Sequence, residues 1–309
     1  MTSASPSNAL RDALQAGRFV AAPGCYDALS ARLAERRGFP AVYMSGLAVT
    51  ASLLARPDLE LLGMEEMVRQ AGLIASAVRI PVIADADTGY GGLASVDRTT
   101  RAYVQAGVAA IHLEDQASPK RCGHLGGVRL IDDHAMSAKL QVALDARAGA
   151  PMLIIARTDA FKAAGLDEAI RRANCYARAG VDLLFVDGLT KTEDFRRVRR
   201  NVDGHLLASV VEIDAPAPTT AAELEAMGYS IAIFPLSGIL AVAAALDRVM
   251  ADIKTHAHTR HTFPDMMTYS ALNEILGIDA YRSMWDRFSQ DRVGSVPFSP
   301  GKQGTDPLP

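Results

Sequence analysis

The sequence has little of what marks secreted, membrane-spanning or nucleic-acid-binding proteins. Its 309 residues include only three cysteines, Cys25, Cys122 and Cys175, and so small and odd a number does not suit a disulfide framework. No basic run occurs and the net charge is −3, which disfavours nucleic acid and anionic membranes as partners. The longest apolar stretches, such as SGILAVAAAL, are too short to span a bilayer, and the first residues lack the apolar core of a signal peptide. We therefore expect a cytoplasmic protein.

A dinucleotide-binding motif is also missing, because no GxGxxG follows the first apolar run. The chain instead repeats one pattern, in which an amphipathic helical stretch ends at a glycine and a short apolar run follows. The apolar runs are nearly continuous, as is typical of parallel strands that are buried on both faces. The glycines between helix and strand favour the left-handed conformation of a helix C-cap, and they are Gly38, Gly107, Gly180 and Gly228.

Eight of these runs are candidate strands, and with 49% hydrophobic residues the chain can bury a large core. The runs lie at residues 18–22, 41–45, 81–86, 109–114, 152–158, 183–187, 206–211 and 230–235. Alternation of eight strands with helices over about 250 residues predicts an α/β fold of the (β/α)₈, or TIM, barrel type. A doubly wound open sheet is the alternative.

The pattern changes beyond residue 255. HAHTRHTFPDMM resembles a linker, and TYSALNEILGIDAYRSMWDRF resembles two short helices broken at Gly277. We predict a catalytic barrel over 1–255, a helical segment over 256–294 and a disordered tail over 295–309. A helical extension beyond a complete barrel favours oligomerisation, whereas helices packed on their own barrel would have the same composition.

Acidic residues gather where the predicted strands end, which is where such barrels carry their active sites. A ring of acids around Arg157 is costly without a cation. Asp85 and Asp87, in DADTGYGG, share one face of a strand, and together with Glu114 they predict a Mg²⁺ site. Capping of the following turn is the alternative role for these two aspartates.

The stretch EDQASPKRCGHLGG, residues 114–127, forms a long loop after the fourth predicted strand, and long loops at this end of a barrel are often lids. Lys120, Arg121 and His124 bring positive charge over an acidic mouth, which suits an anionic substrate. Cys122 lies among them, and neighbouring cations fit a thiol for acid–base chemistry. Cys25 and Cys175 are expected to be small core residues.

These motifs, taken in order, resemble one superfamily. YMSG, then DADTGYGG, then EDQ followed by PKRCGH is similar to the isocitrate lyase/phosphoenolpyruvate mutase superfamily over roughly residues 17 to 290. The KRCGH loop resembles that of the lyase branch, which includes methylisocitrate lyase, dimethylmalate lyase and oxaloacetate acetylhydrolase. GHLGGVRLI, IIARTDA and AIFPLSG also resemble carboxyphosphonoenolpyruvate phosphonomutase.

The resemblance implies how the site would bind metal and substrate. Mg²⁺, for which Mn²⁺ can substitute, would be held by Asp85 directly and by Asp87 and Glu114 partly through water. Asp58 would lie near the metal, although a helix N-cap is an alternative role for it. The implied substrate-binding residues are Ser45, Gly46, Leu47, Asp85, Cys122, Gly123, Arg157, Asp187 and Ser209.

The resemblance also implies a set of catalytic residues, namely Cys122, Tyr43, Arg157 and His124. Cys122 would protonate the carbanion that is left after carbon–carbon cleavage. Tyr43 would handle the proton of the substrate hydroxyl. Arg157 would hold a carboxylate and stabilise developing charge.

The activity implied is that of a Mg²⁺-dependent lyase, which cleaves a substituted malate-type 2-hydroxy dicarboxylate into a 2-oxo acid and a carboxylic acid. The resemblance further implies a homo-oligomer, a dimer or a homotetramer, with C-terminal helices exchanged between subunits. Phosphonomutase-like chemistry and 2-oxo-acid hydrolysis or decarboxylation are alternatives on the same scaffold. A non-catalytic barrel that binds an oxo acid is a third.

Several positions depart from the lyase pattern, among them Val128 in the lid and the segment VEIDAPAP after the seventh strand. Asp187 replaces a usual glutamate, Ser209 replaces a usual asparagine, and Leu240 stands where methylisocitrate lyases place an arginine. Each change shortens or removes a polar group around the distal part of the substrate. The sequence therefore predicts a preference for dicarboxylates over tricarboxylates.

Overall fold

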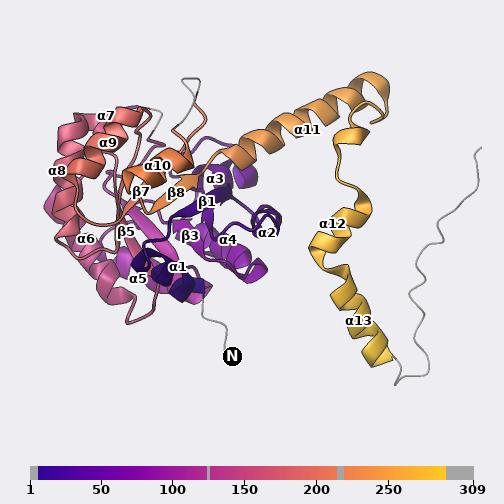
Figure 1. Ribbon diagram of the computed structural model, residues 1–309, viewed down its shortest axis with the longest axis horizontal. Coiled ribbons are helices and arrows are strands. Elements are labelled where there is room, and N and C mark those ends of the chain that lie inside the picture. Colours follow the sequence, from indigo (N-terminus) through magenta and orange to yellow (C-terminus); the bar gives the residue numbers. More distant parts are fainter. Residues whose placement is uncertain (1–5, 124–125, 214–218, 290–309) are drawn as a thin grey trace, which may run out of the picture. The chain divides into compact units, whose positions relative to one another are not determined.

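The structure is a computed structural model that describes residues 6–123, 126–213 and 219–289 (Figure 1). Its contacts divide the chain into two compact units, Met1–Met250 and Ala251–Pro309, which are described separately. The predicted helical segment 256–294 begins inside the second unit. Its last residues and the predicted tail 295–309 lie outside the described residues.

The first unit is a closed barrel of eight parallel strands that follow one another in chain order, with β1 paired to β8. The strands are β1 (Val20–Cys25), β2 (Val42–Met44), β3 (Val82–Asp85), β4 (Ala110–Glu114), β5 (Leu153–Thr158), β6 (Leu183–Val186), β7 (Leu206–Ser209) and β8 (Ile231–Phe234). The predicted fold class is thus confirmed, and each observed strand overlaps a predicted run.

Helices separate the strands and cover the outside of the barrel, while the last one, α11, follows β8 and ends in the second unit (Figure 1). They are α1 (Pro6–Gln15), α2 (Ala28–Arg36), α3 (Gly46–Leu54), α4 (Met64–Ala77), α5 (Leu93–Ala106), α6 (Asp133–Ala146), α7 (Ala160–Ala164), α8 (Leu166–Ala177), α9 (Thr192–Asn201), α10 (Ala221–Met227) and α11 (Ser237–His256). The four glycines predicted at helix ends all have positive φ, between +79° and +89°. Among the described residues, no helix is both long and apolar enough to cross a membrane.

Two layers of apolar side chains hold the barrel together. Strand residues that face outward, such as Val82 and Ala84, are buried against the helices. Residues between them face inward, such as Ile83, and form a separate interior cluster that α1 extends with Leu10 and Leu14. Of the two cysteines expected in the core, Cys25 is fully buried and Cys175 packs partly buried against the outer layer.

This alternation positions the functional side chains. Side chains on a strand point alternately to its two faces, so Asp85, two residues after Ile83, also faces the barrel axis. The same spacing joins Leu153 and Ile155 to Arg157 on β5, and Leu207 to Ser209 on β7. The inward positions are therefore apolar along the strands and polar at their carboxyl ends.

The second unit contains a short 3₁₀ turn, η1 (Phe263–Asp265), and the helices α12 (Tyr269–Leu276) and α13 (Ile278–Ser289). The predicted break at Gly277 is present, because this glycine ends α12 in the left-handed conformation with φ of +77°. Many apolar side chains of α12 and α13 are exposed, among them Tyr269, Leu276, Tyr281, Met284, Trp285 and Phe288.

Candidate active site

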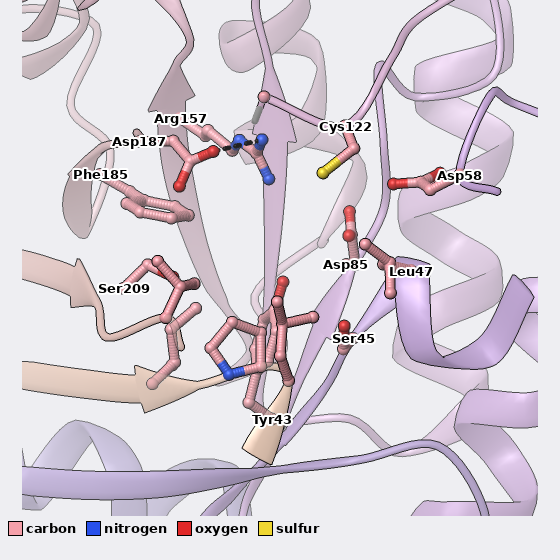
Figure 2. Close-up of a pocket in the computed structure, with 15 residues that line it drawn as sticks. Tyr43, Ser45, Leu47, Asp58, Asp85, Cys122, Arg157, Phe185, Asp187 and Ser209 are labelled. Atoms are coloured by element: carbon pink, nitrogen blue, oxygen red, sulfur yellow. Dashed lines mark hydrogen bonds and ion pairs between the residues drawn. The ribbon is translucent and has the colours of Figure 1, made fainter. Parts of the chain in front are cut away.

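A pocket opens where the strands end (Figure 2). It is lined by Tyr43, Ser45, Leu47, Asp58, Asp85, Cys122, Gly123, Arg157, Phe185, Asp187, Ser209, Val211, Ile233, Pro235 and Leu236. The structure thus brings together most of the predicted site residues. Of the others, Gly46 and Asp87 donate backbone hydrogen bonds to Asp85, and Glu114 pairs with Arg157. His124 lies outside the described residues.

Asp85, at the end of β3, lies at the centre of the polar cluster. Its carboxylate accepts hydrogen bonds from the backbone N–H of Gly46, at 3.2 Å, and of Asp87, at 3.0 Å. Burial alone would raise the pKa of Asp85, but nearby positive charge outweighs it and lowers the pKa to about 2. His112 is uncharged at neutral pH, since burial lowers its own pKa to about 4, so Lys120 and Arg157 supply that charge there.

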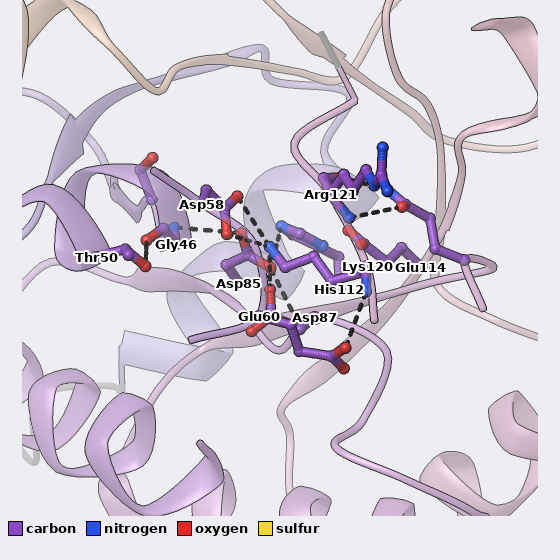
Figure 3. Close-up of polar contacts among 12 residues, drawn as sticks. Gly46, Thr50, Asp58, Glu60, Asp85, Asp87, His112, Glu114, Lys120 and Arg121 are labelled. Carbon is purple, nitrogen blue, oxygen red and sulfur yellow. Dashed lines mark hydrogen bonds and ion pairs between the residues drawn. The ribbon is translucent and has the colours of Figure 1, made fainter. Parts of the chain in front are cut away.

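The side chain of Lys120, on the loop after β4, lies among the acidic side chains (Figure 3). Its ammonium nitrogen lies 2.7 Å from Oδ1 of Asp58 and 2.6 Å from Oδ1 of Asp87. Although burial disfavours the charged form, the surrounding carboxylates hold the pKa of Lys120 well above its usual value. Lys120 was expected to bring positive charge over the acidic mouth, and the structure makes it the direct partner of two predicted metal-site acids.

The carboxylates still outnumber the cations among them. Glu114 is buried, and within the described residues its Oε1 accepts no hydrogen bond. Burial raises the pKa of Glu114 well above its ordinary value and that of Asp87 to about 6. One ligand atom each from Asp85, His112 and Glu114 lie within 4.8 Å of one another. The two buried carboxylates among these three fit a hard divalent cation such as Mg²⁺, whereas His112, an imidazole, was not predicted as a ligand, and Asp87 lies outside this group.

Arg157, at the end of β5, is held by three acids. Its guanidinium donates to both oxygens of Asp159, at 2.8 and 3.1 Å, and to Oδ2 of Asp187 at 2.7 Å. Its Nε also lies 3.3 Å from Oε2 of Glu114. Although Asp187 is one methylene shorter than the glutamate usual in the lyases, it still reaches the arginine. Asp159 was not among the predicted site residues, although its place at the strand end was a usable signal.

Tyr43, on β2, points to the barrel axis beneath the pocket. Its hydroxyl lies 2.9 Å from Nε2 of His112, whose side chain is fully buried. Burial holds the pKa of Tyr43 well above its usual value, so the phenol keeps its proton at neutral pH. The sequence placed His112 at a strand end, but this contact with Tyr43 is visible only in the structure.

Cys122 enters the pocket on the predicted lid, and its sulfur points between Arg157 and Asp58 (Figure 2). The backbone N–H of Cys122 donates to the carbonyl oxygen of Asp58 at 3.1 Å. A Cβ added to the next residue, Gly123, would lie 2.6 Å from Oδ2 of Asp187. The loop therefore lies in close contact with the carboxyl ends of the strands.

One wall of the pocket is apolar, and the sequence interpretation missed it. Phe185, Val211, Ile233, Pro235 and Leu236 form this wall. Counting in steps of two from Asp187 and Ser209 would have found Phe185 and Val211, because alternate residues share a strand face.

Leu240 does not reach the pocket, although the resemblance to methylisocitrate lyases placed it at the distal part of the substrate. It lies in α11, is about half exposed, and is not among the residues that line the pocket. Leu236, four residues earlier and just after β8, lines the pocket in its place.

Comparison with known proteins identifies the family. Residues 10–254 match the family model described as phosphoenolpyruvate phosphomutase. The chain is 39% identical over 283 residues to 2,3-dimethylmalate lyase of Eubacterium barkeri, covering 92% of this chain and 98% of that one. It is 40% identical over 276 residues to 2-methylisocitrate lyase of Aeropyrum pernix, covering 89% of each.

Solved structures agree with this match. Oxaloacetate acetylhydrolase with the inhibitor 3,3-difluorooxalacetate superposes with a TM-score of 0.86 at 32% identity, covering 94% of this chain and 99% of that one. Phosphonopyruvate hydrolase with oxalate and Mg²⁺ superposes with a TM-score of 0.84 at 29% identity, covering 93% and 100%. The barrel, the site at its strand ends and these matches together show that the chain belongs to the phosphoenolpyruvate mutase/isocitrate lyase superfamily.

Proposed function

We propose that this protein is a Mg²⁺-dependent carbon–carbon lyase that cleaves a substituted malate-type 2-hydroxy dicarboxylate into a 2-oxo acid and a carboxylic acid. The observation that carries the proposal is the position of Cys122, whose thiol enters the same pocket as Asp85 and Arg157. A proton donor, a metal-binding carboxylate and an anion-binding guanidinium are what such a cleavage needs. The lyases among the relatives support this choice.

Asp85 and Glu114, whose oxygens already converge, would hold the metal, with Asp87 next to Asp85. Asp58 would act beside it through Lys120, which pairs with both Asp58 and Asp87. Bound Mg²⁺ would supply Lewis-acid stabilisation to the hydroxyl and carboxylate oxygens of the substrate. The buried Oε1 of Glu114 supports this assignment, since a carboxylate oxygen seldom stays buried without a partner.

The substrate would lie between two anion-binding features. One is the start of α3, where Ser45, Gly46 and Leu47 present a helix N-terminus to the pocket. The other is Arg157, which Asp159 and Asp187 fix in one orientation. A dicarboxylate would thus be held at both ends, with the bond to be broken between them.

Cleavage then needs two proton movements. The substrate hydroxyl loses its proton, the C2–O group becomes a carbonyl, and the C2–C3 bond breaks with its electron pair left on C3. The phenol oxygen of Tyr43 would accept the proton of the hydroxyl as the phenol gives its own proton to Nε2 of His112, so that Tyr43 stays protonated throughout. The Cys122 thiol would give its proton to C3, and this produces the carboxylic acid.

The apolar wall of the pocket indicates which kind of substituent the substrate carries. A third carboxylate against Val211 and Leu236 would be an unpaired charge in an apolar setting, which costs several kcal/mol. A small alkyl group there would instead gain about 0.8 kcal/mol for each buried CH₂. An alkyl-substituted malate therefore suits the pocket better than methylisocitrate.

The direct test is to incubate the protein with 2,3-dimethylmalate and Mg²⁺ and to measure pyruvate and propionate, the two halves that this cleavage must produce. Both should form in equal amounts. If neither appears with any malate of this type, the proposal fails. The similarity to oxaloacetate acetylhydrolase favours hydrolysis of oxaloacetate as a second candidate, and formation of oxalate and acetate would identify it.

We also propose that the segment 256–294 assembles the protein into a homo-oligomer, a dimer or a tetramer. Tyr269, Tyr281 and Phe288 are each more than half exposed, and so many large apolar side chains on one pair of helices favour an interaction surface. Exchange of these helices between subunits would cover them. A cytoplasmic location is part of the same proposal, because few cysteines suit a reducing compartment.

A further inference from the structure

Three of the seven histidines of the chain fall within six residues, in the stretch HAHTRH that begins at His256. The sequence analysis took this stretch for a linker, and nothing in the proposed lyase reaction uses it. The structure folds it into a compact cluster. The rings of His256 and His261 have their centroids 4.5 Å apart, and the ring of His258 lies 5.5 and 5.3 Å from them.

A buried carboxylate lies at the centre of this cluster. Asp252 precedes His256 by one turn of α11, and only 5% of its side chain is exposed. Its Oδ1 is 2.9 Å from Nδ1 of His256 and 2.8 Å from Nδ1 of His261. Its Oδ2 accepts hydrogen bonds from the N–H and hydroxyl of Thr262, at 3.3 and 3.2 Å. The pKa of Asp252 is held well below its usual range, chiefly by the hydrogen bond from His261 and then by those from His256 and Thr262.

We infer that Asp252, His256 and His261 form a second metal site, separate from the lyase centre, which binds Zn²⁺. Two imidazole nitrogens and one carboxylate oxygen are a recurrent zinc ligand set. The three ligand atoms already lie within 4.8 Å of one another. A tetrahedral ion with bonds of about 2.0–2.2 Å would need them roughly 3.4 Å apart, so small side-chain movements would admit it.

Each imidazole would bind the ion through a lone pair on Nδ1. In the hydrogen-bonded arrangement each Nδ1 carries a proton and donates it to Asp252. A shift of that proton to Nε2 would turn the Nδ1 lone pair toward the ion, and the side chains of His256 and His261 are 44% and 63% exposed, so water can accept Nε2–H. The same exposure leaves the ion a route of entry and room for a water or His258 as fourth ligand.

The site would have a structural consequence. Asp252 and His256 belong to the last turn of α11, whereas His261 follows the left-handed residue Ala257, at φ of +56°. One ion bound to all three would fix the chain reversal after α11. Hydrogen bonds alone could hold the same turn more weakly, and the experiment must separate these two cases.

The test uses the full chain, stripped with a chelator and then saturated with Mg²⁺ to occupy the lyase centre. Zn²⁺ is added, and bound zinc per chain and thermal stability are measured for wild type, His256→Asn, His261→Asn and the control His205→Asn. His205 is an exposed histidine of the first unit whose Nδ1 contacts Ser230, and it is not one of the three ligands. Lyase turnover and circular dichroism confirm that each variant is folded.

Wild type and His205→Asn should bind one more Zn²⁺ per chain than the two cluster variants, and only they should gain stability from it. Loss of a hydrogen-bond partner of a metal ligand typically weakens metal binding roughly 10- to 100-fold. Removal of a ligand itself should weaken Zn²⁺ binding by more than this. Equal stoichiometry and affinity in all four proteins would overturn the inference, and would leave hydrogen bonding as the role of the cluster.

If the cluster variants do not fold, wild-type crystals soaked in Zn²⁺ and Mg²⁺ give the answer without them. An anomalous zinc peak about 2.0–2.2 Å from Asp252 Oδ1 and from Nδ1 of His256 and His261 would support the site. The absence of a peak there, with zinc present in the soak, would reject it.

Discussion

The backbone N–H of Gly46 donates to Oδ2 of Asp85 at 3.2 Å, and a Cβ added to Gly46 would lie 2.6 Å from that same oxygen. The start of α3 thus fits closely around the carboxylate that we assign to Mg²⁺. Gly46→Ala should displace Asp85 and weaken Mg²⁺ binding by about 10- to 100-fold, which a metal titration of activity would measure. Gly92→Ala is the matched control, because nothing lies within 4 Å of its added Cβ. If both variants behave like wild type, Asp85 does not hold the metal where we place it.

Metal removal should abolish turnover. Burial raises the pKa values of Asp87 and Glu114, so the ionised carboxylates that ligate a metal are favoured only when a divalent cation offsets that cost. Dialysis against EDTA should therefore eliminate activity, and Mg²⁺ or Mn²⁺ should restore it. Full turnover in the presence of EDTA would show that the reaction proceeds without the metal.

Substrate selection should depend on the apolar wall. Leu236→Arg places a cation where Leu236 now lines the pocket, so it should raise kcat/KM for methylisocitrate relative to 2,3-dimethylmalate. We expect at least about a tenfold change in this ratio, which corresponds to about 1.4 kcal/mol. Leu240→Arg is the control, since Leu240 is half exposed and does not line the pocket. A larger effect from Leu240→Arg would mean that the sequence comparison located this position better than the pocket does.

Truncation should dissociate the oligomer. A chain that ends at residue 262 lacks α12 and α13, together with the exposed Tyr269, Trp285 and Phe288. Light scattering should find the full chain as a dimer or tetramer and the truncated chain as a smaller species. A full-length chain that is monomeric at micromolar concentration would contradict the proposed assembly.

Local patterns explain why so much of the barrel could be predicted. Apolar runs that end at polar residues give the strands, and Gly107 or Gly228 mark helix ends because their backbone needs a positive φ. Parallel strands bring their carboxyl ends to one rim, so Asp85, Glu114 and Arg157 could be grouped without a structure.

Contacts between distant residues were beyond the reach of such patterns. Lys120 pairs with Asp58 across 62 positions, and no local signal connects them. The choice between Leu236 and Leu240 depends on where α11 begins, at Ser237, and helix ends are set by tertiary packing as much as by sequence. The cluster around Asp252 was missed because a polar, histidine-rich stretch has the composition of a linker.

The measurement that tests the account most directly is the turnover of Cys122→Ser with 2,3-dimethylmalate and Mg²⁺. Serine keeps the size of the side chain but is a much weaker acid, so protonation of the carbanion should fail while the substrate still binds. We predict a fall in kcat of roughly 10²–10⁴-fold, the usual contribution of a positioned acid, with little change in substrate affinity. A variant that forms pyruvate and propionate at nearly the wild-type rate would show that Cys122 is not the proton donor, and would contradict the mechanism.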